Sequence, residues 1–300
     1  MFSKIIRVLV AVLMLISPTF PHKLSLPAIP RGQDLELDSR FELVWSDEFE
    51  GDKLDTTKWF YPWWETQRKG GFWHEDMVSV KDGNLVITTA YFDEPLENYY
   101  YDKWHENINF DEYKEGWYTG CIETRGKYEF CYGYFECRCI LPKSTGMWSA
   151  FWMMNDGVSN VDGSGQDGTE VDIFESMYYK DAWWGAGDAV VSGIHYDGYG
   201  ADHKGDSIGK WFANNPYEEY NTYGVEWNEN EYIFYVNGVE TGRLSTGGVS
   251  QNPEYLILSC EVAGENGVAN ADRHGTGKIS MKPGDTAEFI VDYVRVYQYK

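Results

Sequence analysis

Short runs of alternating apolar and polar residues, separated by turn signals, limit what this chain can fold into more than any other feature. Two such runs, 233–236 and 239–241, flank Asn237–Gly238, the dipeptide most typical of a tight β-hairpin. The closing run, 289–299, is rich in β-branched and aromatic residues, and no amphipathic helical stripe exceeds a turn or two. We therefore expect a single all-β domain, a sandwich or a barrel, with long loops such as 198–215 at the sheet margins.

Three acids lie within one strand-like run. Side chains at i and i+2 of a strand share a face, so Glu170 and Asp172 should point the same way and Glu175 the opposite way. One extra residue in the strand, a β-bulge, would return Glu175 to the common face. Like charges crowded on a half-buried strand resist ionising together, so a chain that retains three of them is expected to use them.

Two carboxyl groups of different pKa are what glycoside hydrolysis requires. In that chemistry Glu170 would attack the anomeric carbon, and Glu175 would protonate the leaving oxygen and later deprotonate water. Asp172 would orient Glu170, and the pooled negative charge would raise the pKa of Glu175. The alternative is a solvated strand face with Glu175 at its edge.

Tryptophans lie close to the acids in the sequence. Trp148 and Trp152 share a strand face, so pairing with the acid strand would place indoles and acids in one groove. Trp183 follows the acid run and would line the rim. The chain has 13 Trp and 23 Tyr, and such rings stack well on sugars. Core packing is the alternative for each tryptophan.

Composition narrows the partners. A formal net charge of −23 repels nucleic acid and anionic membranes, and there is no basic stripe. The charge also disfavours sulfated polyanions, so a neutral polysaccharide is the expected substrate. The five cysteines form no C-x-x-C pair and no His/Cys cluster, and buried free thiols are expected rather than disulfides.

Several stretches resemble, in order along the chain, those of glycoside hydrolase family 16. The run 170–175 matches that family's E-x-D-x-x-E form, which carries the bulge. Other matching stretches between Phe41 and Tyr299 are 45–49, 132–138, 146–152, 193–196, 223–227 and 291–297. The resemblance implies a concanavalin-like β-jelly-roll sandwich of two curved antiparallel sheets. It also implies a monomer that cleaves a β-linked polysaccharide internally, with retention and without a catalytic cofactor.

The resemblance implies roles for single residues as well. Glu170 falls at the nucleophile position, Asp172 at the assisting acid and Glu175 at the acid/base. Trp148 and Trp152 fall where such enzymes stack sugars beside the cleavage point.

Two further roles follow from the resemblance. His195 falls where the family often has a cleft histidine, although taken alone it is equally a satisfied strand residue. The family often binds one structural Ca²⁺ on its convex side. Asp292 would supply the side-chain ligand, with backbone carbonyls of Glu48 and Gly83 as companions; an ordinary hydrogen-bonded aspartate is the alternative.

The substrate is open to several hypotheses. The leading one is an endo-β-glucanase acting on β-1,3 or mixed β-1,3/1,4-glucan. The same machinery acting on a β-galactan or agar-type polysaccharide, a transglycosylase, and a non-catalytic lectin are the alternatives; a lectin would typically have lost Glu170 or Glu175. Ser259 stands where many β-1,3-glucanases of the family have Asn, and Glu261 adds another acid. These departures leave linkage specificity undecided.

The N-terminus resembles an export signal. A positive start with Lys4 and Arg7 precedes a short apolar run, 8–16, without a small-residue cleavage site. A cleaved signal peptide or a retained anchor is therefore expected, and a secreted or cell-surface location with it. The expected divisions are residues 1–21 as signal peptide or anchor, 22–40 as linker and 41–300 as the catalytic domain.

Overall fold

The computed structural model describes residues 28–30, 37, 39–62, 66–97, 113–177, 179, 189–269 and 279–300. Within these ranges the first ten strands are β1 (Phe41–Asp47), β2 (Gln67–Arg68), β3 (Gly71–Trp73), β4 (Val78–Lys81), β5 (Asn84–Phe92), β6 (Gly116–Thr119), β7 (Cys121–Glu123), β8 (Glu129–Phe130), β9 (Gly133–Ile140) and β10 (Met147–Met154). The others are β11 (Glu170–Ser176), β12 (Ala189–Tyr196), β13 (Lys204–Phe212), β14 (Asn221–Trp227), β15 (Tyr232–Val236), β16 (Val239–Leu244), β17 (Glu254–Val262), β18 (Gly264–Glu265), β19 (Val268–Ala269) and β20 (Thr286–Tyr299). Two short 3-10 helices, η1 (Glu75–Met77) and η2 (Asp156–Ser159), complete the elements.

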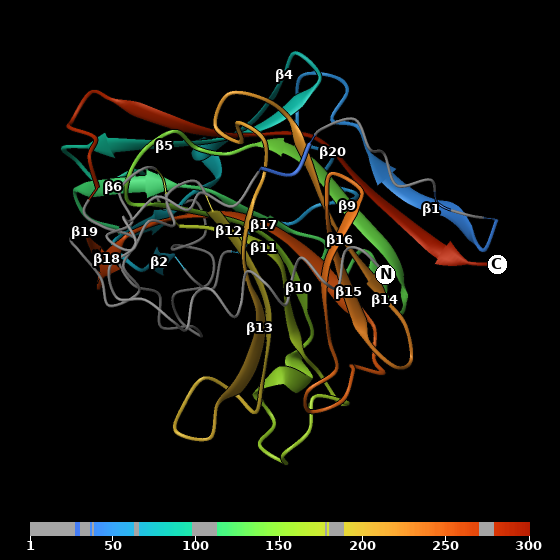
Figure 1. The fold of residues 1–300 in the computed structure, drawn as a ribbon. Helices are drawn as coiled ribbons and strands as arrows, with labels where there is room; N and C mark the ends of the chain where they lie inside the picture. Colours follow the sequence, from blue (N-terminus) through green and yellow to red (C-terminus); the bar gives the residue numbers. More distant parts are fainter. Residues whose placement is uncertain are drawn as a thin grey trace, which may run out of the picture.

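Two large sheets make up the molecule (Figure 1). The eleven-stranded sheet has the order β16-β15-β14-β9-β20-β5-β6-β3-β2, with β1 added on β20 and β4 on β5. The seven-stranded sheet has the order β13-β12-β11-β10-β17-β7, with β8 added on β17. Strand pairs in the described part of the chain are antiparallel except β3 with β6. This arrangement confirms the expected all-β sandwich.

A core cluster of apolar side chains joins the two sheets. From β11 it takes Val171, Ile173 and Phe174, all essentially without solvent exposure. The Phe174 ring lies 4.3 Å, centroid to centroid, from the ring of Tyr223 on β14 of the other sheet. It also meets Phe289 of β20 edge-on at 6.1 Å. The acid strand is therefore fixed by rings from the opposite sheet.

The pairing of β11 contains the expected bulge. Against β10, Phe174 pairs with Phe151 but Asp172 pairs with Trp152, so Ile173 is an extra residue. The register against β12 shifts over the same stretch. Because Ile173 and Phe174 both join the core cluster, the alternation is broken once and Glu175 returns to the face of Asp172.

Two local predictions meet different outcomes. The β15–β16 hairpin is confirmed, and its turn residues Asn237 and Gly238 have φ values of 50° and 74°, as a type I′ turn requires. The range 198–215, expected to be a loop, instead contains β13, which pairs with β12 at the sheet edge. Most of β13 is solvent-exposed. Its sequence therefore lacks the alternation of apolar and polar residues from which a strand is predicted.

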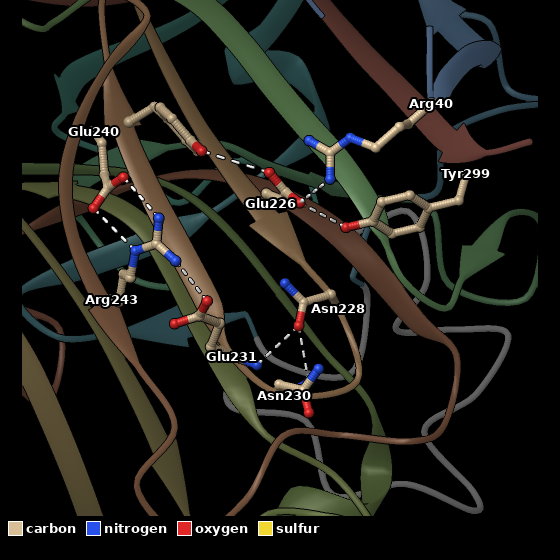
Figure 2. A network of polar contacts seen from close by, with 9 residues as sticks. Arg40, Glu226, Asn228, Asn230, Glu231, Glu240, Arg243 and Tyr299 are labelled. Carbon is tan, nitrogen blue, oxygen red and sulfur yellow. Dashed lines mark hydrogen bonds and ion pairs between the residues drawn. The ribbon is translucent and has the colours of Figure 1, made fainter. Parts of the chain in front are cut away.

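A polar network ties the C-terminal end of β20 to the β14–β16 edge (Figure 2). The buried carboxylate of Glu226 accepts a 2.8 Å hydrogen bond from the Tyr299 hydroxyl, and Arg40 approaches it to 3.7 Å. Nearby, Arg243 bonds the carboxylates of Glu240 and Glu231. Exposed pairs such as those of Arg243 contribute little, whereas the buried Glu226 depends on its donors.

The cysteines are free, as expected. Cys121, Cys137, Cys139 and Cys260 are buried, and Cys131 is half-buried. In the ranges that the structure covers, no helix has the length and apolar character needed to cross a membrane.

Replacing the ring that holds the acid strand should destabilise the fold. We expect Phe174→Ala to lower the free energy of unfolding by about 3–5 kcal/mol, the usual loss for a buried phenylalanine. The exposed Val268→Ala serves as the control. Denaturant unfolding followed by tryptophan fluorescence measures both, and a loss below about 1 kcal/mol for Phe174→Ala would contradict the role given to this ring.

Candidate active site

Three carboxylates lie on the face of β11 that points away from the core. Glu170 and Glu175 are half-buried, and Asp172 is only 4% exposed. The bulge described above is what brings the third acid to this face. One short strand therefore presents three ionisable groups of the same sign to a single site.

The neighbouring strand β10 supplies a donor to the acid at the end of the row. The indole Nε1 of Trp148 donates a 2.7 Å hydrogen bond to Oε1 of Glu175. Trp152, on the same strand, donates to Oγ of Ser259 on β17 at 3.1 Å. The structure thus brings both tryptophans to the acids. Ser259 thus holds the indole of Trp152.

Strand β12 places a histidine beside the central acid. Nε2 of His195 lies 3.3 Å from Oδ2 of Asp172, and its Nδ1 lies 2.9 Å from Nε2 of His203. A Cβ at position 205 would lie 2.7 Å from that Nδ1, so Gly205 leaves the ring its room. One ligand-type atom each from Glu170, Asp172 and His195 lie within 4.8 Å of one another, which shows how compact the site is.

Burial and mutual repulsion raise the pKa values of both outer acids. Burial, followed by the charge of Asp172, raises the pKa of Glu170 to about 7. The same two causes raise the pKa of Glu175 well above its ordinary value. Burial lowers the pKa of His195, but its hydrogen bond to Asp172 and that group's charge outweigh burial, so the net shift is upward. The two glutamates titrate as a coupled pair.

Sequence reasoning missed four residues of this site. Tyr199, in the turn after β12, donates its hydroxyl to Oε2 of Glu170. His203 follows it at the start of β13. The available signal in the sequence was the pair of glycines that flank Tyr199 close to the end of a strand. Residues in such loops often take part in binding or catalysis.

The other two are cations of the β2 region. Arg68 bonds Oε1 of Glu261 at 2.6 and 2.9 Å and lies 4.8 Å from the centroid of the Trp73 ring. Lys69 Nζ lies 4.9 Å from the centroid of the Trp148 ring. No carboxylate in the described ranges forms an ion pair with Lys69. Isolated lysine and arginine residues carry no sequence signal, so only the fold identifies them.

Two other predicted sets fare differently. Trp183 lies outside the described residues. Arg138 pairs with the Asp292 carboxylate, so an ion there would share that carboxylate with the guanidinium. Gly83 lies in the turn between β4 and β5, and Glu48 follows β1. A structural Ca²⁺ held by Asp292 and the backbone carbonyls of Glu48 and Gly83 stays a prediction.

With Glu175 protonated and Glu170 ionised, the site offers an acid and a nucleophile on one strand face. The Trp148 indole borders Glu175, and His195 borders Asp172, which stands between the two glutamates in the strand. Glycoside hydrolysis uses such a pair, with one carboxyl group protonated and the other ionised. The carboxylates need no metal for such chemistry.

Comparisons with known proteins agree with this geometry. A family model described as the GH16 domain of β-porphyranases A–D matches residues 42–299. Glucan endo-1,3-β-glucosidase A1 of Niallia circulans is 30% identical over 85% of this chain, which spans 38% of that protein. β-Porphyranase B of Zobellia galactanivorans is 33% identical over 64% of each chain.

A solved structure supports the same assignment. The non-specific endo-β-1,3(4)-glucanase SCLam superposes with a TM-score of 0.65 at 25% identity, covering 88% of this chain and 93% of that one. The match of the family model over nearly the whole sandwich carries the conclusion. The chain belongs to glycoside hydrolase family 16.

Proposed function

We propose that this enzyme cleaves an agar-type β-galactan by double displacement. One observation favours that polymer over glucan: Lys69, which has no carboxylate partner in the described ranges, lies against the Trp148 indole of the site although the chain as a whole is strongly acidic. Agar-type galactans often carry sulfate esters, which such a cation would bind, whereas β-1,3-glucans are neutral. The match to a porphyranase family model supports the same choice. This proposal replaces the expectation of a neutral substrate, because the net charge of the whole chain does not give the charge of the groups at the site.

The first step uses the proton on Glu175. A Glu170 oxygen attacks the anomeric carbon, the glycosidic C–O bond breaks, and the leaving oxygen takes the proton from Glu175. The indole of Trp148 holds Glu175 through its Oε1. The product is a glycosyl ester of Glu170.

The second step returns the proton. Glu175, now a carboxylate, takes a proton from water, the water oxygen attacks the anomeric carbon, and the ester bond to Glu170 breaks. Asp172 carries the negative charge next to Glu175, and Nε2 of His195 lies 3.3 Å from its Oδ2. That charge favours a proton on Glu175 each time the cycle restarts.

A β-1,3 or mixed-linkage glucan is the second candidate substrate. The β-glucanase of Rhodothermus marinus is 26% identical over 86% of each chain, and SCLam acts on β-1,3(4)-glucan. A lectin is disfavoured because both Glu170 and Glu175 are present on one face. Export as a secreted or surface enzyme completes the proposal, supported by the apolar N-terminal run.

Removing each glutamate should have a distinct chemical result. We expect Glu170→Ala to lose activity on the order of 10⁴-fold and Glu175→Ala about 10²–10⁴-fold. Azide should rescue Glu170→Ala with inversion, giving the α-glycosyl azide from an activated aryl β-glycoside, and Glu175→Ala with retention, giving the β-azide. Nuclear magnetic resonance of the products decides between them, and Glu288→Ala, a half-buried acid on β20 that pairs with Lys81, is the control. The same azide anomer from both variants would refute the assigned roles.

The pH profile should report the coupled acids. Activity needs Glu170 ionised and Glu175 protonated, so kcat/KM rises as Glu170 loses its proton and falls as Glu175 does. The acidic limb should reflect the pKa of about 7 for Glu170. Asp172→Asn removes a negative neighbour, which lowers the pKa of both glutamates and should move both limbs to lower pH. Limbs that stay in place while the rate falls would contradict this electrostatic role.

Lys69 should set the preference for a charged polymer. We expect wild type to release reducing sugar faster from porphyran, which is sulfated, than from agarose, laminarin or mixed-linkage glucan. Lys69→Met should lower kcat/KM on porphyran roughly fivefold, about 1 kcal/mol for one partly exposed ion pair, and leave agarose within about twofold. The control is Lys143→Met, a surface lysine paired with Glu218. Faster release from laminarin by wild type would favour the glucanase alternative instead.

A further inference from the structure

One aromatic residue of the site contacts the nucleophile itself. The Tyr199 side chain is 58% exposed, yet its hydroxyl donates to Oε2 of Glu170. Both the burial of Tyr199's hydroxyl end and the charge of Glu170 raise the pKa of Tyr199, so the phenol keeps its proton and remains a donor.

Contacts of Asp197 hold the turn that carries Tyr199 in place. Asp197 adopts a left-handed conformation with φ of 61°, and its fully buried carboxylate binds Lys204. Its Oδ1 accepts hydrogen bonds from the backbone N–H of Asp162 at 3.2 Å and of Gly163 at 3.0 Å. An aspartate that joins the turn to a second loop in this way holds the tyrosine over the acid strand.

Stacked rings position Tyr199 from the side. Its ring lies 6.3 Å from the ring of His203 with an interplanar angle of 20°. His203 in turn lies 4.9 Å from His195 at 24°. The hydroxyl is therefore aimed at Glu170 by a column of three rings that ends on β12, and substituting the hydroxyl alone would leave this column in place.

We infer that Tyr199 is a catalytic residue that accelerates breakdown of the glycosyl-enzyme, by donating a hydrogen bond to the Glu170 oxygen that does not bond to the sugar. This inference rests on the proposed double displacement. While Glu170 is a carboxylate, the bond is charge-assisted; in the ester it becomes an ordinary, weaker hydrogen bond. The donor therefore stabilises the free nucleophile relative to the intermediate.

The two steps respond in opposite ways to such a donor. As water attacks and the bond between the anomeric carbon and Glu170 breaks, the electron pair returns to the carboxylate and the hydrogen bond regains its strength. During the first attack the carboxylate loses charge, so the same donor gives no acceleration there. Removing the hydroxyl should slow the second step and let the ester accumulate.

Other charged groups face Glu170 and fix the background for this test. They are Asp172 on the same strand, His195 on β12, Arg68 on β2 and Glu254 on β17, with Glu175 coupled through Asp172. All of them remain in a tyrosine-to-phenylalanine variant. Loss of the hydroxyl alone removes a donor that lowers the pKa of Glu170.

The test compares wild type, Tyr199→Phe and Tyr220→Phe. Tyr220 is the matched control, because this variant also loses a hydroxyl that makes a hydrogen bond, here 2.7 Å to Asn84. Tyr220 directly precedes β14 of the eleven-stranded sheet, not a strand of the sheet that carries Glu170. The probe is the 2-chloro-4-nitrophenyl glycoside of the oligosaccharide that wild type releases from its polymer. Its fast-leaving aglycone makes breakdown of the intermediate limit kcat.

For Tyr199→Phe we expect kcat to fall about tenfold and kcat/KM to stay within about twofold, as the loss of one charge-assisted bond in the second step implies. A burst of about one aglycone per enzyme should appear. Acid-quenched protein should gain the mass of one oligosaccharide, and the acidic limb of kcat/KM should move to higher pH. Tyr220→Phe should resemble wild type in all four measurements.

Three results would overturn the inference. Equal falls in kcat and kcat/KM without accumulated ester would make Tyr199 an ordinary binding contact. A lower KM with undiminished kcat would mean that the ring merely covers the site, and unchanged kinetics would leave it no role. If wild type and Tyr220→Phe release no aglycone either, the proposed function fails first, and the inference falls with it.

Discussion

Everything at this site depends on two consecutive apolar residues that bury in the same direction. Ile173 and Phe174 both enter the core between the sheets, although strict alternation would send one of them outward. Burial of the extra side chain stabilises the irregular register, because each large apolar side chain removed from water contributes about 1.5–3 kcal/mol to the stability of the fold. The position of Glu175 beside Asp172 is therefore set by packing on the opposite face of the strand.

Neighbouring strands make the crowded acids tolerable. Each carboxylate has its own donor: Trp148 for Glu175, Tyr199 for Glu170 and His195 for Asp172. These donors come from β10, from the turn after β12 and from β12 itself. Strand order thus determines which acid receives which partner, so three similar side chains on one strand have different surroundings.

Sequence reasoning succeeded where a periodic pattern or a motif carries the information. The hairpin at Asn237–Gly238 and the bulge in 170–175 both followed from the period of two, and the fold class followed with them. It failed where long-range contacts decide. Lys69 comes to Trp148 only because the start of the sandwich folds onto the seven-stranded sheet. The ion pair between Asp292 and Arg138 likewise joins two strands, and no sequence pattern predicted it.

The raised pKa values of the catalytic pair link folding to protons. In the unfolded chain both glutamates titrate near 4.5, whereas in the folded chain Glu170 titrates at about 7 and Glu175 also above its ordinary value. Between these limits the folded chain binds more protons than the unfolded one, so unfolding releases protons and stability falls as pH rises. In the proposed mechanism Glu170 must ionise, and that ionisation lowers the stability of the folded sandwich. The pH range in which the enzyme works is therefore a compromise between its activity and the stability of its fold.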